Sequence, residues 1–375
     1  MRFTLSSTAL SSCLNTLSRV INSKNSLPIL DCFLFQVSDG LLSITASDSE
    51  NIMQSTLKLD SAEGDGDFAI PSRTILDAVK ELPEQPLNFD IDMDTFNIKV
   101  TYLNGLYSFT AQSAEEYPHA QKVDSEDTTT ITLDAGILVD NLTRSLFATA
   151  DDELRPVMNG VYFDLTAESL NIVSSDGHKL VRNKFYGIKS DAPSAFILPK
   201  KPSTLLKNIL GRDSGDVTIR FNGHNSEIKF NNSILNCRLI EGRYPNYNSV
   251  IPNDNPNKLT IDRKSLLSAL RRVIPFASES SELVRFQLGN GKLELNSEDL
   301  DFATSAKEQL SCDYSGQSMS IGFKGTSLQE ILTNLESDEI IMELADPSRA
   351  GIVYPATQPE NSEILMLLMP MLLND

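Results

Sequence analysis

The sequence predicts an α+β protein built from three repeated domains, each with two helices packed on antiparallel sheets. Three observations support this fold class. A short motif begins at residues 3, 131 and 259, so that successive copies are 128 residues apart. Each copy is followed by the same order of strands and helices. The length of 375 residues is too great for one ordinary core and matches three units of about 125 residues each.

The repeated motif is an apolar-Thr-apolar strand end followed by a residue that can cap a helix. The cap residues of the three copies are Ser6, Asp134 and Asp262. Apolar residues then recur at spacings of three and four, as expected of an amphipathic helix with one buried stripe. The second of these helices is expected to run through Ala150.

Each first helix is expected to lead into a hairpin, at residues 33–45, 161–173 and 284–295. A second strand and helix follow, at residues 68–82, 196–210 and 321–335. Helices of about 11 to 14 residues are expected, stabilised by burying one stripe against a sheet. The joins follow the aromatic-proline pairs Tyr117-Pro118 and Tyr244-Pro245, which gives domains at residues 1–124, 125–254 and 255–375.

The composition is that of a soluble globular protein, with 40% apolar and 22% charged residues. No apolar run approaches the roughly 20 residues of a membrane span. Residues 10–13 resemble a lipoprotein cleavage box, but Ser6, Ser7 and Ser11 interrupt the apolar stretch that a signal peptide needs. Four cysteines without CxxC spacing predict buried free thiols in a reducing cytosol: Cys13, Cys32, Cys237 and Cys312.

Catalytic chemistry is not indicated. His119, His178 and His224 share no metal-ligand spacing, and no nucleophile, Walker or dinucleotide motif is present. Residues 289–292 are glycine-rich, but they lie between strands and predict a hairpin turn. We therefore expect no catalytic residue, no metal and no cofactor.

The charge pattern has two interpretations. A net charge of −19, from 32 basic and 51 acidic residues, argues against a nucleic-acid partner. Basic residues nevertheless recur at the predicted helices, whereas acidic residues concentrate in loops. The helix faces are either simply solvated or form a phosphate-tracking surface built from six helices. The residues concerned are Arg19, Arg73, Lys80, Arg144, Lys200, Lys201, Lys207, Arg263, Lys264, Arg271 and Arg272.

Four segments together resemble one known family. They are Leu-Pro-Ile-Leu at 27–30, Ser-Asp-Gly-His-Lys-Leu at 175–180, Glu-Gly-Arg-Tyr-Pro-Asn-Tyr at 241–247 and Met-Pro-Met at 369–371. In this order, and with three repeats, they resemble the bacterial sliding clamps, the beta subunits of DNA polymerase III. The resemblance implies three DNA-clamp domains per chain and a head-to-tail homodimeric ring whose helices line a central hole.

The resemblance also implies a function and partners. The ring would encircle duplex DNA as a DNA polymerase processivity factor, without catalysis and without sequence preference. Implied partners are the DNA polymerase III alpha subunit, a clamp-loader ATPase complex, and other polymerases and repair enzymes with clamp-binding peptides. The protein would be cytoplasmic, with no membrane contact. The alternative is a repeat-domain scaffold that binds proteins but not DNA.

Site residues follow from the resemblance position by position. DNA contacts are expected at Lys24, Arg73, Lys200 and Lys201, and the basic helix faces add Arg144, Arg271 and Arg272. The dimer interface is expected to join Tyr107 and Phe109 of one chain to Pro275 and Phe276 of the other. A peptide-binding pocket between domains two and three is expected at Met158, Ser175, Gly177, His178, Lys179, Leu180, Pro245, Val250, Leu367, Met369, Pro370 and Met371.

The chain departs from the family pattern at several of these places. Ser249 and Leu372 stand where many members have Arg, and Lys179 replaces a frequent Arg. Residues 374–375 extend the usual end. These departures are expected to change which peptides the pocket prefers, but they leave its apolar residues in place. The remaining interpretation of residues 369–373 is a core strand without a binding role.

Overall fold

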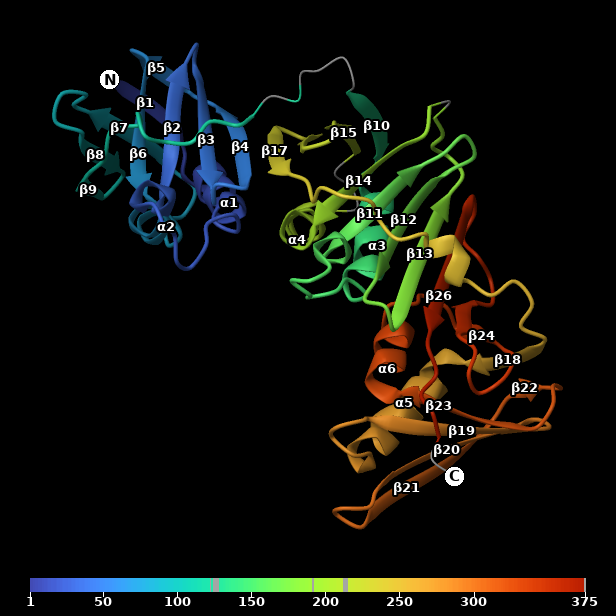
Figure 1. The fold of residues 1–375 in the computed structure, drawn as a ribbon. Coiled ribbons are helices and arrows are strands. Elements are labelled where there is room, and N and C mark those ends of the chain that lie inside the picture. Colours follow the sequence, from blue (N-terminus) through green and yellow to red (C-terminus); the bar gives the residue numbers. More distant parts are fainter. Residues whose placement is uncertain (122, 124–127, 191, 212–214, 374–375) are drawn as a thin grey trace. The chain divides into compact units, whose positions relative to one another are not determined.

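The computed structural model describes residues 1–121, 123, 128–190, 192–211 and 215–373 (Figure 1). Within it the chain forms two compact units. The first unit contains residues 1–139 and 205–239, and the second contains residues 140–204 and 240–375. The second repeat therefore contributes to both units.

The first repeat begins with β1 (Arg2–Ser6) and α1 (Ser7–Leu17). Its further elements are η1 (Pro28–Asp31), β2 (Cys32–Ser38), β3 (Leu41–Ser47), β4 (Asn51–Lys58), β5 (Ser61–Glu63), β6 (Gly66–Pro71), α2 (Ser72–Val79), β7 (Pro86–Ile91), β8 (Asn97–Tyr102) and β9 (Gly105–Thr110).

The second repeat begins with β10 (Thr129–Asp134) and α3 (Ala135–Leu146). Its further elements are η2 (Pro156–Met158), β11 (Gly160–Leu165), β12 (Leu170–Ser175), β13 (Lys179–Phe185), β14 (Ser194–Pro199), α4 (Lys200–Ile209), β15 (Asp216–Phe221), β16 (Asn225–Phe230), β17 (Ser233–Arg238) and η3 (Tyr247–Val250).

The third repeat begins with β18 (Asn257–Asp262) and α5 (Arg263–Val273). Its further elements are η4 (Ile274–Phe276), β19 (Leu283–Gly289), β20 (Lys292–Asp299), β21 (Thr304–Ser311), β22 (Asp313–Tyr314), β23 (Met319–Lys324), α6 (Gly325–Thr333), β24 (Glu339–Leu344), β25 (Gly351–Pro355) and β26 (Ser362–Leu368). The predicted hairpin turn at residues 289–292 connects β19 to β20.

The helix caps expected from the repeated motif are present in all three copies. The Ser6 side chain accepts from the Ala9 N–H at 3.1 Å, and Asp134 accepts from the Ile137 N–H at 3.2 Å. Asp262 accepts from the Ser265 N–H at 2.7 Å. Each side chain satisfies one of the N–H groups that a helix start leaves without an intrahelical partner.

Helix lengths differ from the prediction. The second helix of each repeat has only eight to ten residues, in α2, α4 and α6, shorter than the expected 11 to 14. Helix α3 ends at Leu146 and not at Ala150. Helix α1 ends at Leu17, so that Arg19 lies beyond it, although Val20 is still buried by the following turn. The apolar pattern in the sequence therefore continues beyond the hydrogen-bonded end of the helix, because residues of the following turn are also buried in the core.

Sheets cross the boundaries between repeats. In the first unit, an eight-stranded sheet has the order β10-β15-β16-β17-β4-β3-β2-β6, and β4 of repeat one pairs with β17 of repeat two. A five-stranded sheet has the order β5-β1-β7-β8-β9.

In the second unit, a nine-stranded sheet has the order β14-β11-β12-β13-β26-β25-β24-β18-β22, and β13 pairs with β26 of repeat three. A four-stranded sheet has the order β21-β20-β19-β23. Every described strand pair is antiparallel, as predicted.

The helices pack in pairs against these sheets. Helix α1 contacts α2, and α5 contacts α6. In the third repeat, Leu266 and Leu270 of α5 and Leu328 of α6 share one fully buried cluster with Phe286 and Phe323 of the four-stranded sheet. Among the described residues, no helix is long and apolar enough to span a membrane.

The cysteines are free, as predicted. Cys13, Cys32 and Cys237 are buried, whereas Cys312 is only half-buried, which the sequence did not indicate. Burial raises the pKa of the Cys13 and Cys237 thiols to about 12.

Candidate functional site

A tight turn between β12 and β13 carries the predicted residues 175–178. Asp176 Oδ1 accepts from the backbone N–H groups of His178 and Lys179, both at 2.8 Å. Gly177 has φ +92°, a region that L side chains rarely adopt. A Cβ at Gly177 would also lie 3.1 Å from Arg155 Nη1. The backbone conformation of the turn therefore favours glycine at this position, and the turn leaves His178 exposed at its tip.

The C-terminal tail passes along this turn. The Met369 N–H donates to the His178 carbonyl at 2.8 Å, and the Met371 N–H donates to the Gly322 carbonyl at 2.8 Å. The tail thus runs from the β12–β13 turn of repeat two to β23 of repeat three. The structure brings residues 175–178 and 369–371 together, as the resemblance implies.

An apolar floor supports the turn and the tail. Leu180 of β13 and Leu367 of β26 are buried in one cluster with Tyr244. The Tyr244 ring stacks on Tyr162, with centroids 4.5 Å apart. The Tyr247 hydroxyl donates to Asp164 Oδ2 at 2.6 Å. Burial raises the pKa of the Tyr244 and Tyr247 hydroxyls, so both stay protonated at neutral pH.

The predicted pocket residues divide by exposure. Met158, Leu180 and Leu367 are buried. Ser175, Lys179, Pro370 and Met371 are half-buried, and Gly177, His178, Pro245, Val250 and Met369 are exposed. Met369 is 40% exposed and the adjoining Leu372 is 83% exposed, so the tail after β26 is not a core strand. Exposed apolar groups above a buried apolar floor form a surface suited to an apolar peptide segment.

Sequence reasoning missed two neighbours of this slot. Arg155 lies over Gly177 and pairs with Asp152 at 2.8 Å. Glu330, on α6, lies 3.0 Å from the Lys179 ammonium. Lys179 itself is predicted to line the pocket, but its side chain is only 11% exposed. A signal for Arg155 was available, because it lies three residues before Met158, but nothing in the sequence links Glu330 to Lys179.

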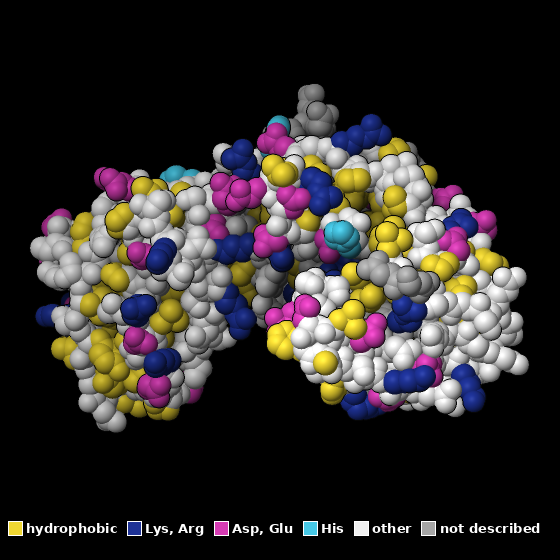
Figure 2. Space-filling model, turned by 60° about the horizontal axis from the view of Figure 1, so that its bottom comes forward, with side chains coloured by type: hydrophobic (Ala, Val, Ile, Leu, Met, Phe, Trp, Pro, Cys, Tyr) yellow, Lys and Arg dark blue, Asp and Glu magenta, His cyan; other side chains and the backbone are white. Residues whose placement is uncertain are grey.

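The predicted DNA contacts lie on or beside helices. Lys24 follows α1, Arg73 lies on α2, Arg144 is in the last turn of α3, and Lys200 and Lys201 begin α4. Arg271 and Arg272 are in the last turn of α5. Within the described residues, Lys24, Arg73, Lys200 and Arg271 have no ion-pair partner. Figure 2 shows dark-blue basic side chains interspersed with magenta acidic ones on the visible face.

Three details correct the expectation of a basic surface built from six helices. Helices α1 and α6 contain no Lys or Arg. Arg272 pairs with Glu308, whose carboxylate accepts from Arg272 Nε at 2.9 Å. Arg263 donates to the carbonyls of Ser337 and Leu332, at 2.7 and 2.8 Å, and so caps the end of α6.

The predicted interface residues lie beside strands at sheet edges. Tyr107 and Phe109 are half-buried residues of β9, which pairs only with β8 within the described chain. Pro275 and Phe276 form the exposed turn η4, which contacts β20 and β21. Strand β21 is likewise an edge strand and, within the described chain, pairs only with β20. Phe276 is 41% exposed.

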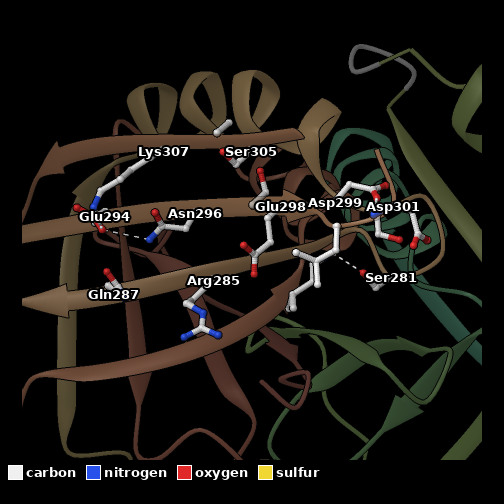
Figure 3. A pocket seen from close by; sticks show the side chains of 15 residues that line it. Ser281, Arg285, Gln287, Glu294, Asn296, Glu298, Asp299, Asp301, Ser305 and Lys307 are labelled. Atoms are coloured by element: carbon white, nitrogen blue, oxygen red, sulfur yellow. Dashed lines mark hydrogen bonds and ion pairs between the residues drawn. The ribbon is translucent and has the colours of Figure 1, made fainter. Parts of the chain in front are cut away.

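A groove of about 760 Å³ lies beside β21, on the exposed face of the four-stranded sheet (Figure 3). Lys307 Nζ lies 2.7 Å from Glu294 Oε1, and Asn296 donates to the same oxygen at 3.2 Å. In Figure 3, Asp299 lies near Asp301 at one end of the groove, and Glu298 lies between Asn296 and Asp299. Among the described residues, no group of His, Cys, Asp and Glu could hold a metal ion.

Family models match the chain in three consecutive segments. They describe the N-terminal, central and C-terminal domains of the DNA polymerase III beta subunit and match residues 1–121, 132–246 and 248–372. The beta sliding clamp of Pseudomonas putida is 25% identical over 367 residues, with 98% of this chain and 99% of the relative covered. The beta sliding clamp of Escherichia coli K12 is 25% identical over 366 residues, with the same coverage.

Solved structures show the same fold. The Pseudomonas aeruginosa sliding clamp, solved with griselimycin bound, has a TM-score of 0.93 at 24% identity, with both chains fully covered. The beta subunit of Thermotoga maritima has a TM-score of 0.89 at 25% identity, again with full coverage. With all three domains matched in order along the whole chain, this protein belongs to the DNA polymerase III beta subunit family, the bacterial sliding clamps.

Proposed function

We propose that this chain is the DNA polymerase processivity factor of its cell, a homodimeric ring that encircles duplex DNA and tethers the replicative polymerase. One observation carries the ring. Strand β4 of repeat one pairs with the last strand of repeat two, β17, and β13 of repeat two pairs with the last strand of repeat three, β26. The repeat makes β21 the equivalent of β4 and β13, and β9 the equivalent of β17 and β26.

Strands β21 and β9 are therefore the two strands for which this junction is missing. Each is an unpaired edge within the described chain. An edge strand presents free N–H and C=O groups and is a template for pairing with another chain. Pairing β21 of one protomer with β9 of its partner repeats the same junction a third time. It is a head-to-tail contact, and two such contacts close a dimer.

The predicted interface residues support this junction. Tyr107 and Phe109 lie on β9, and Phe276 lies in η4 beside β21. The groove of Figure 3 is lined by residues of β21 and by the apolar Leu300, which is 84% exposed. Phe302, in the same connection between β20 and β21, is 77% exposed. Exposed apolar residues beside an open strand edge suit the centre of a protein interface.

DNA binding is assigned to the basic helix positions. Lys24, Arg73, Lys200 and Arg271 are exposed and carry charge that no described acid neutralises. Contacts from such side chains to phosphates hold duplex DNA without reading its sequence and exchange as the ring moves. The overall charge of −19 keeps DNA from the rest of the surface.

The slot at the β12–β13 turn is assigned to partner peptides. Two thioethers, Met369 and Met371, beside a rigid apolar floor suit several related apolar segments. The partners are the polymerase III alpha subunit, the clamp-loader ATPase complex, and other polymerases and repair enzymes. The chain acts in the cytoplasm without catalysis of its own, and its domains span residues 1–124, 125–254 and 255–375.

Topology tests the ring. Protein loaded by its loader ATPase onto nicked circular DNA should remain bound through gel filtration in high salt. Cutting the circle once should release it, because a ring slides off an end. Release at the same rate from circular and linear DNA would contradict encirclement. Stable binding of partner peptides without any retention on circular DNA would instead support a scaffold that does not bind DNA.

A double substitution tests the slot. Met369→Ala with Pro370→Ala removes one exposed and one half-buried side chain and leaves the backbone bond from residue 369 to His178 possible. Polarisation of a labelled Gln-Leu-Ser-Leu-Phe peptide should show an affinity loss of at least about tenfold, because few anchors carry most of the binding energy. Equal affinity with an intact dimer would place the peptide site elsewhere.

A further inference from the structure

An ionic cluster lies beneath the β12–β13 turn. The Lys179 ammonium lies 3.1 Å from Asp176 Oδ2 and 3.0 Å from Glu330 Oε2. It also lies 5.9 Å from the centroid of the Phe147 ring. The Lys179 side chain is 11% exposed and that of Glu330 is 48% exposed. Two carboxylates thus neutralise an ammonium that solvent barely reaches.

This cluster connects the two segments that form the slot, the β12–β13 turn and the C-terminal tail with its supporting elements. Asp176 belongs to the turn and fixes it by accepting from the backbone N–H groups of His178 and Lys179. Glu330 belongs to α6, which directly follows β23. Strand β23 also holds the tail, because its Gly322 carbonyl accepts from the Met371 N–H. One ammonium therefore ties the turn of repeat two to the helix behind the tail of repeat three.

The two central groups are charged at neutral pH. Burial opposes ionisation of Asp176, but the backbone N–H groups of Lys179 and His178 and the Lys179 ammonium outweigh it and hold the Asp176 pKa below its usual value. Burial also opposes the charge on Lys179, but its bonds to Glu330 and Asp176 raise the Lys179 pKa. Because the Lys179 ammonium is already paired with two carboxylates and shielded from solvent, it is poorly placed to bind a peptide directly.

We propose that Lys179 is a positioning residue, which sets the affinity of the slot for partner peptides by tying the β12–β13 turn to Glu330 of α6. The proposal rests on the proposed function of the slot and differs from the role that family resemblance gives Lys179, which is direct contact with the peptide. Fixing His178 and the tail before binding removes an entropic cost that the peptide would otherwise bear. Glu330 becomes part of the site although it lies outside the slot's predicted lining.

Peptide affinity in the full-length protein tests this role. With the labelled Gln-Leu-Ser-Leu-Phe peptide, Lys179→Met should weaken binding by about tenfold, within the range expected for coupled neighbours. Glu330→Gln should weaken it in the same direction. Lys179→Arg should restore near wild-type affinity, because a guanidinium can still reach both carboxylates. The double variant Lys179→Met with Glu330→Gln should bind no worse than Lys179→Met alone, because both changes break one tie.

A second ion pair that also involves β13 gives a matched control. Arg182 of β13 pairs with Glu363 of β26, with side chains 16% and 37% exposed, farther from the turn. Arg182→Met should leave peptide affinity unchanged. An equal loss in Arg182→Met would make the effect a general consequence of weakening the sheet and would overturn the proposal.

Direct contact gives a different result. If Lys179 binds the peptide itself, Lys179→Met weakens binding while Glu330→Gln leaves it unchanged or strengthens it, and the two effects add. Wild-type binding with unchanged affinity in every variant would overturn the positioning role alone. Absence of peptide binding to the wild-type dimer would overturn the slot as well. If Lys179→Met does not fold by circular dichroism, Glu330→Gln still decides between the two roles, because it weakens binding only if the tie to α6 matters.

Discussion

Truncating Phe276 to Ala should dissociate the dimer. A phenylalanine side chain buries about 200 Å², and Phe276 is 41% exposed in the protomer. A partner that covers it removes about 80 Å² from water, worth about 2 kcal/mol at 25 cal/mol per Å². Two equivalent junctions close the ring, so the loss approaches about 4 kcal/mol. The dimer dissociation constant should rise by up to roughly a thousandfold.

Sedimentation velocity across nanomolar to micromolar protein measures this shift. Leu41→Ala is a matched control, because Leu41 is 44% exposed and lies in the first repeat, away from both sheet edges. The control should dissociate like the wild type. Phe276→Asp should have a larger effect than Phe276→Ala, because it would bury a charge without a partner. A Phe276→Ala dimer with wild-type affinity would refute the assignment of η4 and β21 to the interface.

Two further predictions concern DNA binding and thiols. In the triple variant of Arg73, Lys200 and Lys201 to Ala, the slope of the logarithm of DNA affinity against the logarithm of salt concentration should fall by about one unit for each phosphate that is no longer neutralised. Sequence preference should not change. A slope identical to that of the wild type in filter binding would mean that these residues face solvent and do not contact DNA. At pH 8 Ellman's reagent should modify Cys312 first, because it is half-buried whereas the other three thiols are buried, and all four thiols should react only in guanidinium. Burial also raises the pKa of the Cys13 thiol to about 12, which slows its reaction further. Rapid modification of Cys13 in the native dimer would contradict its burial.

The local features of the fold could be predicted from the sequence. The strand end, cap and helix of each repeat depend on residues within one or two turns of each other, as in the bond from Asp262 to the Ser265 N–H. Hairpins and the apolar stripe of each helix are encoded at equally short range. The boundaries of α2, α4 and α6 were less accessible, because residues beyond a helix end also contribute to the core.

The candidate site depended on a different kind of information. The motifs at 175–180 and 369–371 indicated a slot through resemblance, and the backbone bond from Met369 to His178 shows that they are neighbours. The exposure of the charged side chains could not be deduced from sequence motifs. Lys179 and Arg272 appeared as available charges, but each has carboxylate partners from distant segments, Glu330 and Glu308.

The sequence by itself determined the three repeats, their order of elements and the family, because periodicity and short motifs are properties of neighbouring residues. Only the tertiary structure decided which strands join one repeat to the next. Pairing of β4 with β17 and of β13 with β26 is a long-range choice of register. The same choice leaves β9 and β21 as open edges and places Glu330 against Lys179. Ion pairs and sheet edges depend on distances across the fold, and no local pattern in the chain specifies them.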